Sequence, residues 1–315
     1  MRHLRHRYRY TTTTTIMAAH IVPTPVLPPL PAVGRHTVLL VGDSITERGG
    51  EVLPEEGTGW ALQLASTYAR RADVLNRGYS GYSTRFLRAM LPAVIPPPEA
   101  APRHLFATIF LGANDSAGWD EAVERAPAQH VPLPEFRDNL AALIAAAAGA
   151  AAAVFVLSPP PVDTARWSSR SNAAVTAYTA AVAEVVRAAA AGSGVVPVTH
   201  IDLYAGMTAA VAAAGTVEAG APPGWHAYLS DGLHLSPAGN TFVLRALQAA
   251  IAGAAPWAVP DALTIDFPRW DDVPNESAAV AAAALSPAAL AELRAVPRPR
   301  FRAAVAAVAE AVVAE

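Results

Sequence analysis

Short apolar runs alternate along the chain with longer segments in which apolar residues recur every three or four positions. This alternation predicts β-strands and amphipathic helices in turn. The first, third and fourth of the short runs are almost wholly apolar, which is typical of strands that helices cover on both faces. The expected strands span Thr37–Val41, Asp73–Asn76, Leu105–Leu111, Ala153–Leu157 and Val195–Ile201.

The longer segments predict the helices of the same domain. Regular exchange of strand and helix favours a parallel sheet with right-handed crossovers, and so a three-layer α/β/α sandwich around a five-stranded sheet. The last helix has a marked beginning, because Ser236 is a good N-cap and Pro237 suits the first helical position. The expected helices span Gly59–Arg70, Thr84–Leu91, Pro134–Ala148, Asn172–Ala191, Leu203–Ala214 and Pro237–Ala254.

Polar and glycine-rich segments follow the ends of the first four expected strands. Ser44 follows the first strand, and NRGYSGYSTR (residues 76–85) follows the second. GANDS (residues 112–116) follows the third strand, and SPPP (residues 158–161) follows the fourth. Because ligands bind beyond the carboxyl ends of the strands in such sheets, we expect these segments to meet in one site.

Composition narrows the class of protein. The chain has 315 residues, of which 53% are hydrophobic, enough for one large or two small globular domains. Its net charge of −3 gives no basic field that would attract nucleic acid. It has no cysteine, which excludes disulfides, thiolate metal sites and a cysteine nucleophile. No apolar run has the length and character of a membrane span.

The two ends of the chain differ from its middle. Residues 1–34 begin with the basic, threonine-rich sequence MRHLRHRYRYTTTTT, which fits a transit peptide, a disordered tail or a true start at Met17. Residues 275–315 are alanine-rich and predict a helical extension. We therefore expect the globular domain to span residues 35–274. The expected location is cytoplasmic, with an organelle as the alternative if residues 1–34 are a transit peptide.

Ser44, Asp231 and His234 are the candidates for nucleophilic catalysis. A serine nucleophile needs a base that removes its proton, and the base needs an acceptor that orients it. Within the segment SDGLHLS, Asp231 could accept from one imidazole nitrogen of His234 while the other nitrogen faces Ser44. Gly232 would let the loop bend between the two. Taken alone, the segment also fits an Asx-turn with a surface histidine before a capped helix.

A serine hydrolase also needs hydrogen-bond donors for the oxyanion that develops on its substrate. Three candidates follow the strand ends: the backbone N–H groups of Ser44 and Gly81 and the side-chain amide of Asn114. A glycine at position 81 lets the backbone approach a ligand closely. Each residue alone also fits an ordinary turn, and only their convergence at one sheet edge favours an oxyanion site.

Other chemistry finds less support in the sequence. His200 and Asp202 share a strand face and form a second-choice histidine–aspartate pair. The remaining histidines lack the spacing of a metal site, so we expect no metal. GANDSAG lacks the lysine of a phosphate-binding loop, and no G-x-G-x-x-G opens a helix after a strand. We therefore expect no nucleotide and no cofactor.

Taken in order, the polar segments resemble those of the SGNH, or GDSL-type, hydrolases. That family's four blocks centre on Ser, Gly, Asn and His, which match Ser44, Gly81, Asn114 and His234. From about residue 37 to residue 273, the chain is also similar to the isoamyl acetate-hydrolysing esterase subgroup. The segments that carry this closer resemblance are GDSIT, GWALQLA, DVLNRGYSGYSTR, GANDS, VPLPEFRDNL, SPPP, DGLHLSPAGN and FPRWDDV.

The resemblance implies a flavodoxin-like fold and a serine carboxylesterase that acts on short-chain esters, acetates especially, through an acyl-enzyme intermediate. Its partner would be a small-molecule ester, and the oligomeric state stays open. A sugar deacetylase, a thioesterase or lysophospholipase, an acyltransferase and a non-catalytic binding module remain alternatives. Asp43, Tyr82 and Ser83 are the candidates for substrate binding. Because Ser83 and ERGG (Glu47–Gly50) depart from the subgroup's pattern, we expect a pocket that differs from the usual one.

Overall fold

The computed structural model describes the middle of the chain, namely residues 35–53, 57–97, 104–118, 128–193, 196–214, 224–263 and 265. The predictions for residues 1–34 and 275–315 lie outside the described residues, as does residue 274, where the globular domain was expected to end. Within the described ranges, from His36 to Ala254, one or two α-helices follow each strand of the central sheet, in keeping with the alternation that the hydrophobic pattern predicts.

The central sheet has five strands, and each neighbouring pair runs parallel. Gly42, the last residue of β1 (His36–Gly42), pairs with Gly78 on one side and with Phe110 on the other. Three strands therefore end at the same level, and the loops that follow them meet at one edge. In spatial order the strands are β4 (Ala72–Gly78), β1 (His36–Gly42), β5 (Phe106–Phe110), β6 (Val154–Leu157) and β7 (Val198–Ile201).

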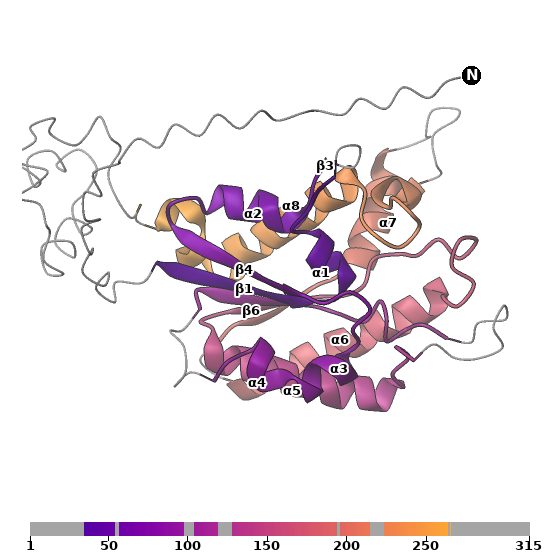
Figure 1. Cartoon of the computed structure of the whole chain (residues 1–315), viewed down its shortest axis with the longest axis horizontal. Coiled ribbons are helices and arrows are strands. Elements are labelled where there is room, and N and C mark those ends of the chain that lie inside the picture. Colours follow the sequence, from indigo (N-terminus) through magenta and orange to yellow (C-terminus); the bar gives the residue numbers. More distant parts are fainter. Residues whose placement is uncertain are drawn as a thin grey trace, which may run out of the picture. The chain divides into compact units, whose positions relative to one another are not determined.

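Helices cover both faces of this sheet and complete the predicted three-layer sandwich, as Figure 1 shows. One face carries α1 (Ser44–Arg48), α2 (Trp60–Thr67), α7 (Leu203–Ala214) and α8 (Pro237–Ala254). The other face carries α3 (Thr84–Ala89), α4 (Leu91–Val94), α5 (Leu133–Ala150) and α6 (Asn172–Ser193).

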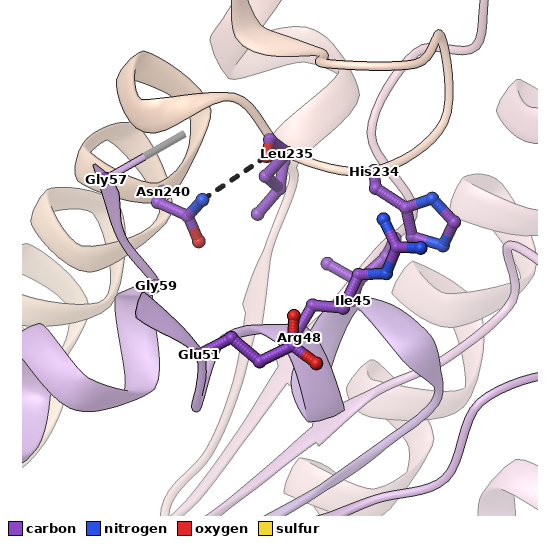
Figure 2. Close-up of a pocket in the computed structure, with 8 residues that line it drawn as sticks. All are labelled: Ile45, Arg48, Glu51, Gly57, Gly59, His234, Leu235 and Asn240. Carbon is purple, nitrogen blue, oxygen red and sulfur yellow. Dashed lines mark hydrogen bonds between the residues drawn. The ribbon is translucent and has the colours of Figure 1, made fainter. Parts of the chain in front are cut away.

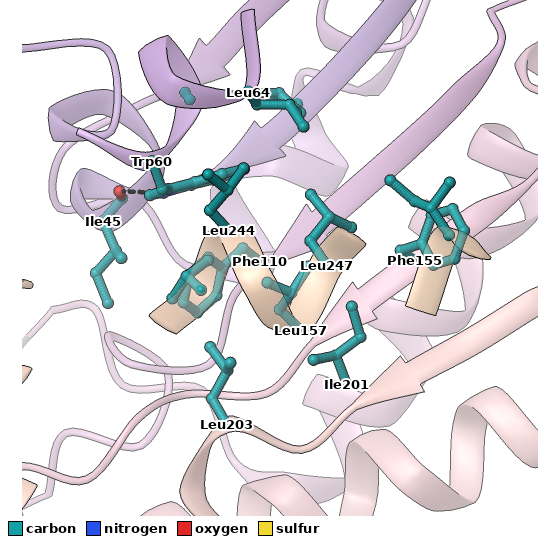
Figure 3. Packing of buried hydrophobic residues seen from close by; sticks show 14 of the residues in the cluster. Ile45, Trp60, Leu64, Phe110, Phe155, Leu157, Ile201, Leu203, Leu244 and Leu247 are labelled. Carbon is teal, nitrogen blue, oxygen red and sulfur yellow. Dashed lines mark hydrogen bonds between the residues drawn. The ribbon is translucent and has the colours of Figure 1, made fainter. Parts of the chain in front are cut away.

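Burial of β1 on both faces explains its uninterrupted apolar sequence. Val38 and Leu40 belong to the core cluster beneath α2 and α8, part of which is drawn in Figure 3. Leu39 and Val41 belong to the cluster beneath α5. All four side chains are at most 1% exposed, and burying such a side chain contributes about 1.5–3 kcal/mol. β1, the strand that precedes Ser44, is thus held in place by packing on both of its faces.

Several boundaries differ from the sequence-based expectation for local reasons. The helix predicted for Thr84–Leu91 is divided at Met90, because Pro92 is suited to the first turn of a helix and lies in that of a separate short helix that begins at Leu91. Arg70 takes a positive φ of 65°, so the helix predicted to reach it ends earlier, at Thr67. The short elements that the pattern did not predict are α1, β2 (Val52–Leu53), β3 (Gly57–Thr58), η1 (Gly224–Tyr228), η2 (Pro256–Ala258) and η3 (Pro260–Ala262).

One helix of the described part, Asn172–Gly192, has the length and apolar composition that a membrane span requires. Of its most apolar window, 39% is buried in the fold. Tyr178 and Val182 on that buried side pack in the cluster beneath α5. The helix is therefore a weak candidate, and the described residues contain no clear membrane span.

Candidate active site

The turn after β1 presents Ser44 at the start of α1. Asp43 Oδ1 accepts a hydrogen bond from the Ile45 N–H at 2.9 Å and so caps the helix that begins at Ser44. Gly42 lies so close to β5 that an added Cβ would come within 2.7 Å of the Phe110 carbonyl oxygen. The sequence Gly-Asp-Ser thus turns the chain directly from a buried strand into a helix. Ser44 is left 9% exposed at the sheet edge.

Asp231 and His234 form a short hydrogen-bonded loop that reaches Ser44. Asp231 Oδ1 accepts from the backbone N–H groups of Leu233 at 3.0 Å and His234 at 2.8 Å. Its Oδ2 lies 2.6 Å from His234 Nδ1, and His234 Nε2 lies 2.9 Å from Ser44 Oγ. Gly232, with a φ of 93°, allows the bend between acid and base. The structure therefore brings the three predicted catalytic residues into one hydrogen-bonded chain.

The Asp231 carboxylate is strongly held in its ionised form. Burial opposes ionisation, but hydrogen bonds from His234 and Leu233 outweigh it and lower the pKa of Asp231 to about 2. The Arg48 guanidinium adds a cation 3.8 Å from Asp231 Oδ2. An ionised Asp231 accepts from Nδ1–H of the imidazole, which leaves Nε2 free to receive a proton from Ser44.

The predicted oxyanion donors follow the ends of β1, β4 and β5. Among the described residues, the backbone N–H groups of Ser44 and Gly81 have no hydrogen-bond acceptor. Gly81 has a φ of 78°, a conformation that other residues rarely adopt. Asn114 is 5% exposed, and its Nδ2 donates to the Tyr82 carbonyl oxygen at 2.9 Å. The second hydrogen of that amide has no acceptor among the described residues and can serve a ligand.

Glu47 fixes the loop that contains Gly81. Its carboxylate accepts from the Ser80 N–H on Oε2 at 2.7 Å and from the Ser80 hydroxyl on Oε1 at 2.8 Å. Glu47 is the first residue of ERGG, the segment that departs from the subgroup's pattern. Its contact with Ser80 spans 33 positions of sequence, so no local pattern could have indicated it.

Buried charges lie behind the oxyanion donors. Burial raises the pKa of Asp43 to about 7 and that of Asp115 to about 6. Asp115 Oδ1 accepts from the backbone N–H of Thr84 at 2.9 Å and from its hydroxyl at 2.5 Å, which joins the start of α3 to the loop after β5. Arg170 supplies the positive charge that faces both carboxyl groups. The predicted donors thus lie next to titratable groups that the fold removes from water.

The predicted substrate-binding residues occupy different positions from one another. Asp43 and Ser83 are 1% and 0% exposed, so neither side chain is open to a ligand in this structure. Asp43 acts instead as the helix cap, and Ser83 lies at the N-cap position of α3. Tyr82 is half-buried and stacks on Tyr79, with ring centroids 5.3 Å apart, and the centroid of the tilted Phe86 ring lies 5.6 Å from that of Tyr82.

The second-choice pair, His200 and Asp202, is not joined by a hydrogen bond. Asp202 Oδ1 accepts from the Ala205 N–H at 2.9 Å and so caps α7. Burial lowers the pKa of His200, whose Nε2 has no partner within the described residues. No group of metal-ligating side chains occurs in the described ranges either.

A cavity opens beside His234, between α1 and α8, as Figure 2 shows. Charged side chains of α1 and of the segment that follows it border this cavity, together with the polar Asn240. Asn240 is already occupied, since its Nδ2 donates to the Leu235 carbonyl oxygen at 3.3 Å. The residues that line the cavity are Ile45, Arg48, Glu51, Gly57, Gly59, His234, Leu235 and Asn240.

The loop between β6 and α6 contains contacts that the sequence did not indicate. Asp163 N–H donates to the Gly232 carbonyl oxygen at 2.8 Å, and Trp167 Nε1 donates to the Asp231 carbonyl oxygen at 3.1 Å. Arg170, three residues further along, contacts Asn114. These side chains follow SPPP, and neither their type nor their spacing is a known signal of such a role.

Comparison with known proteins identifies the family to which the chain is related. Residues 40–242 match the model of the GDSL-like lipase/acylhydrolase family. The chain is 33% identical over 249 residues to isoamyl acetate-hydrolyzing esterase 1 homolog of Bos taurus, covering 75% of this chain and 87% of the relative. It is 30% identical over 250 residues to isoamyl acetate-hydrolyzing esterase of Saccharomyces cerevisiae, covering 75% and 94%. Among solved structures, an acetylxylan esterase from Geobacillus stearothermophilus superposes with a TM-score of 0.51 at 21% identity, covering 69% and 94%.

Proposed function

Because the chain belongs to the GDSL-like lipase/acylhydrolase family and is a carboxylic ester hydrolase, we propose that it hydrolyses short-chain, acetate-type esters with Ser44 as nucleophile. His234 is the proposed base and Asp231 its orienting acid. The observation that carries this proposal is the chain of contacts of 2.9 Å from Ser44 Oγ to His234 Nε2 and 2.6 Å from Nδ1 to Asp231.

In the first step, Ser44 Oγ attacks the carbonyl carbon of the ester, and its proton passes to His234 Nε2. The carbonyl oxygen becomes an oxyanion, which accepts from the N–H groups of Ser44 and Gly81 and from Asn114 Nδ2. Asp231 stabilises the imidazolium that has formed. Donors of this kind are effective because they need no reorganisation when the charge develops.

In the second step, the tetrahedral intermediate collapses and the bond to the alcohol oxygen breaks. His234 gives its proton to the departing alcohol, and the acyl group stays on Ser44 as an ester. Water then attacks the acyl carbon while His234 accepts a proton from it. A second collapse releases the carboxylic acid and returns the proton to Ser44. Each proton is thus carried by His234, and these steps require no cofactor.

The short acyl group in this proposal comes from the relatives, several of which bear names that refer to isoamyl acetate. The alcohol half is less restricted. Arg48 and Glu51 border the cavity beside His234, the residue that protonates the leaving alcohol. Their charges favour a hydroxyl-rich alcohol, as in an acetylated sugar, as the second candidate substrate.

A panel of esters tests both candidates. We expect p-nitrophenyl acetate to be hydrolysed faster than the octanoate, and Ser44→Ala to abolish hydrolysis of both. A fluorophosphonate probe should label the wild type and leave Ser44→Ala unlabelled. Hydrolysis by Ser44→Ala at the wild-type rate would refute the proposed nucleophile. The rates with isoamyl acetate and with an acetylated sugar then show which alcohol half is preferred. Addition of a free alcohol tests for acyl transfer, because a transferase would pass the acyl group to that alcohol instead of to water.

A further inference from the structure

Arg170 contacts the oxyanion side of the site from the loop between β6 and α6. Its Nη2 donates to Asn114 Oδ1 at 3.1 Å, and its Nη1 donates to the carbonyl oxygen of Ala113. The guanidinium therefore holds both the side chain of Asn114 and the backbone directly before it. This contact joins residues 56 positions apart.

The two contacts of the Asn114 side chain determine which way its amide faces. Tyr82 offers only a carbonyl oxygen to Asn114 Nδ2, and Arg170 offers only donors to Oδ1. A rotation by 180° would place Nδ2 against the guanidinium and Oδ1 against the Tyr82 carbonyl, so both contacts would become repulsive. Since one hydrogen of Nδ2 is given to Tyr82, the direction of the other hydrogen is fixed as well.

The guanidinium is itself held in place by its surroundings. The carboxyl groups of Asp43 and Asp115 favour its positive charge, which burial alone would disfavour. Its central carbon lies 5.7 Å from the centre of the Trp167 ring, within the range of a cation–π contact. Arg170 is thus restrained by charge and by an aromatic face, and it can restrain Asn114 in turn.

We propose that Arg170 is a positioning residue of this esterase, whose guanidinium fixes the Asn114 amide so that its second N–H meets the oxyanion. The inference rests on the proposed function, in which Asn114 is an oxyanion donor. Arg170 touches neither substrate nor reacting atoms in this account. Its effect belongs to the transition state, because the direction of the N–H matters most when the negative charge develops.

Arg170→Lys tests the proposal while keeping a positive charge beside the two buried carboxyl groups. An ammonium group lacks the planar fork that donates to two oxygens at once. We expect kcat for p-nitrophenyl acetate to fall roughly 10- to 100-fold, as for loss of a charged hydrogen bond, with KM changed less than about twofold. We expect a larger fall in kcat for Arg170→Met. Arg137→Gln, which removes an exposed arginine paired with Glu184, is the matched control and should keep wild-type kcat.

A double-mutant cycle separates positioning from a merely structural role. In an Asn114→Ala background, Arg170→Lys should lower kcat by less than about twofold, because the group that it positions is already absent. An equal fall in both backgrounds, or no fall in either, would overturn the proposal, whatever happens to the thermal midpoint. If Asn114→Ala itself keeps full kcat, the positioning role is overturned with the oxyanion role of Asn114. Labelling of Ser44 by a fluorophosphonate reports separately on the nucleophile.

Discussion

The two halves of the proposed site, its acid–base half and its oxyanion half, are held together in different ways. The acid–base half is one loop, in which Asp231 and His234 lie three positions apart and hydrogen-bond to each other through side chain and backbone. The oxyanion half comes from three strand ends and is tied to distant residues, such as Glu47 at Ser80 and Arg170 at Asn114.

One half thus depends on contacts within a single loop, and the other depends on contacts between residues that are distant in the sequence. A local loop sets its own geometry, tolerates partial exposure and leaves a short sequence pattern. A site assembled from several strands needs other residues to hold its donors in place. Such residues are of common types, and they form no recognisable sequence pattern with the donors. Substitutions in the two halves should therefore lower activity for different reasons. In the acid–base half they remove the chemistry of one contact, whereas in the oxyanion half they change the position of a donor or the buried charge beside it.

The largest effect is expected from Asp231→Asn. The amide oxygen can still accept from the backbone of the loop, but an NH₂ group would face His234 Nδ1 and favour the wrong tautomer. We expect kcat to fall about 10⁴-fold with little change in fold, as for loss of the acid in a serine triad. Steady-state kinetics and circular dichroism check this. Asp202→Asn, at the cap of α7, is the control and should keep wild-type kcat; a similar loss there would point to the second-choice pair.

The next effect is expected from Asn114→Ala in the oxyanion half. One donor is lost, so kcat should fall about 10²- to 10³-fold while KM changes little. Stopped-flow measurement of acylation with p-nitrophenyl acetate locates the loss in the chemical step. A change confined to KM would show that Asn114 binds the substrate in its ground state. It would contradict the assignment of Asn114 to the oxyanion half.

Buried charge predicts a pH effect on stability that belongs to the oxyanion half. Because the pKa of Asp43 is raised to about 7, the folded protein keeps a proton that the unfolded chain loses above about pH 4. Stability should therefore decline as pH rises from 4 to 7. Relative to Asp43→Asn, the wild type should lose about 2.6 kcal/mol of unfolding free energy between pH 5 and pH 8. Denaturant unfolding across this range measures the difference, and parallel curves would contradict the raised pKa.

The smallest effect is expected from Glu47→Gln. The substitution keeps an acceptor for Ser80 but removes the negative charge that both donors share. We expect kcat to fall roughly 3- to 10-fold, in keeping with one weakened hydrogen bond beside Gly81. Ser80→Ala should have a similar effect, and combining the two should add little. Independent losses would show that Glu47 acts on something other than this loop.

The fold was predictable because its signals are local. The apolar runs of β1, β5 and β6 indicated strands buried on both faces, and Ser236 with Pro237 marked the start of α8, where Ser236 Oγ accepts from the Gly239 N–H at 3.2 Å. Shorter elements escaped prediction, since helix α1 has only five residues and depends on a side-chain cap at Asp43.

The candidate site was predictable only in part, for the same reason. Ser44, Asp231 and His234 could be chosen because serine, acid and base are distinctive types and two of them lie in one loop. Arg170 and Glu47 could not, because their roles follow from contacts across 56 and 33 positions. Asp43 was placed against the substrate, whereas the tight turn after Gly42 directs its carboxylate into the protein instead.

The contact between Ser44 and His234 spans 190 positions of the chain, and this bears on when the protein can become active during its synthesis. At about 5–20 residues per second, the proposed base His234 leaves the ribosome roughly 10–40 s after the proposed nucleophile Ser44. Throughout that interval the nascent chain carries a serine without a partner. Under the proposed mechanism, esterase activity therefore requires that the segment containing His234, directly before α8, has been synthesised. The time at which activity appears in a timed translation reaction would date the contact between Ser44 and His234.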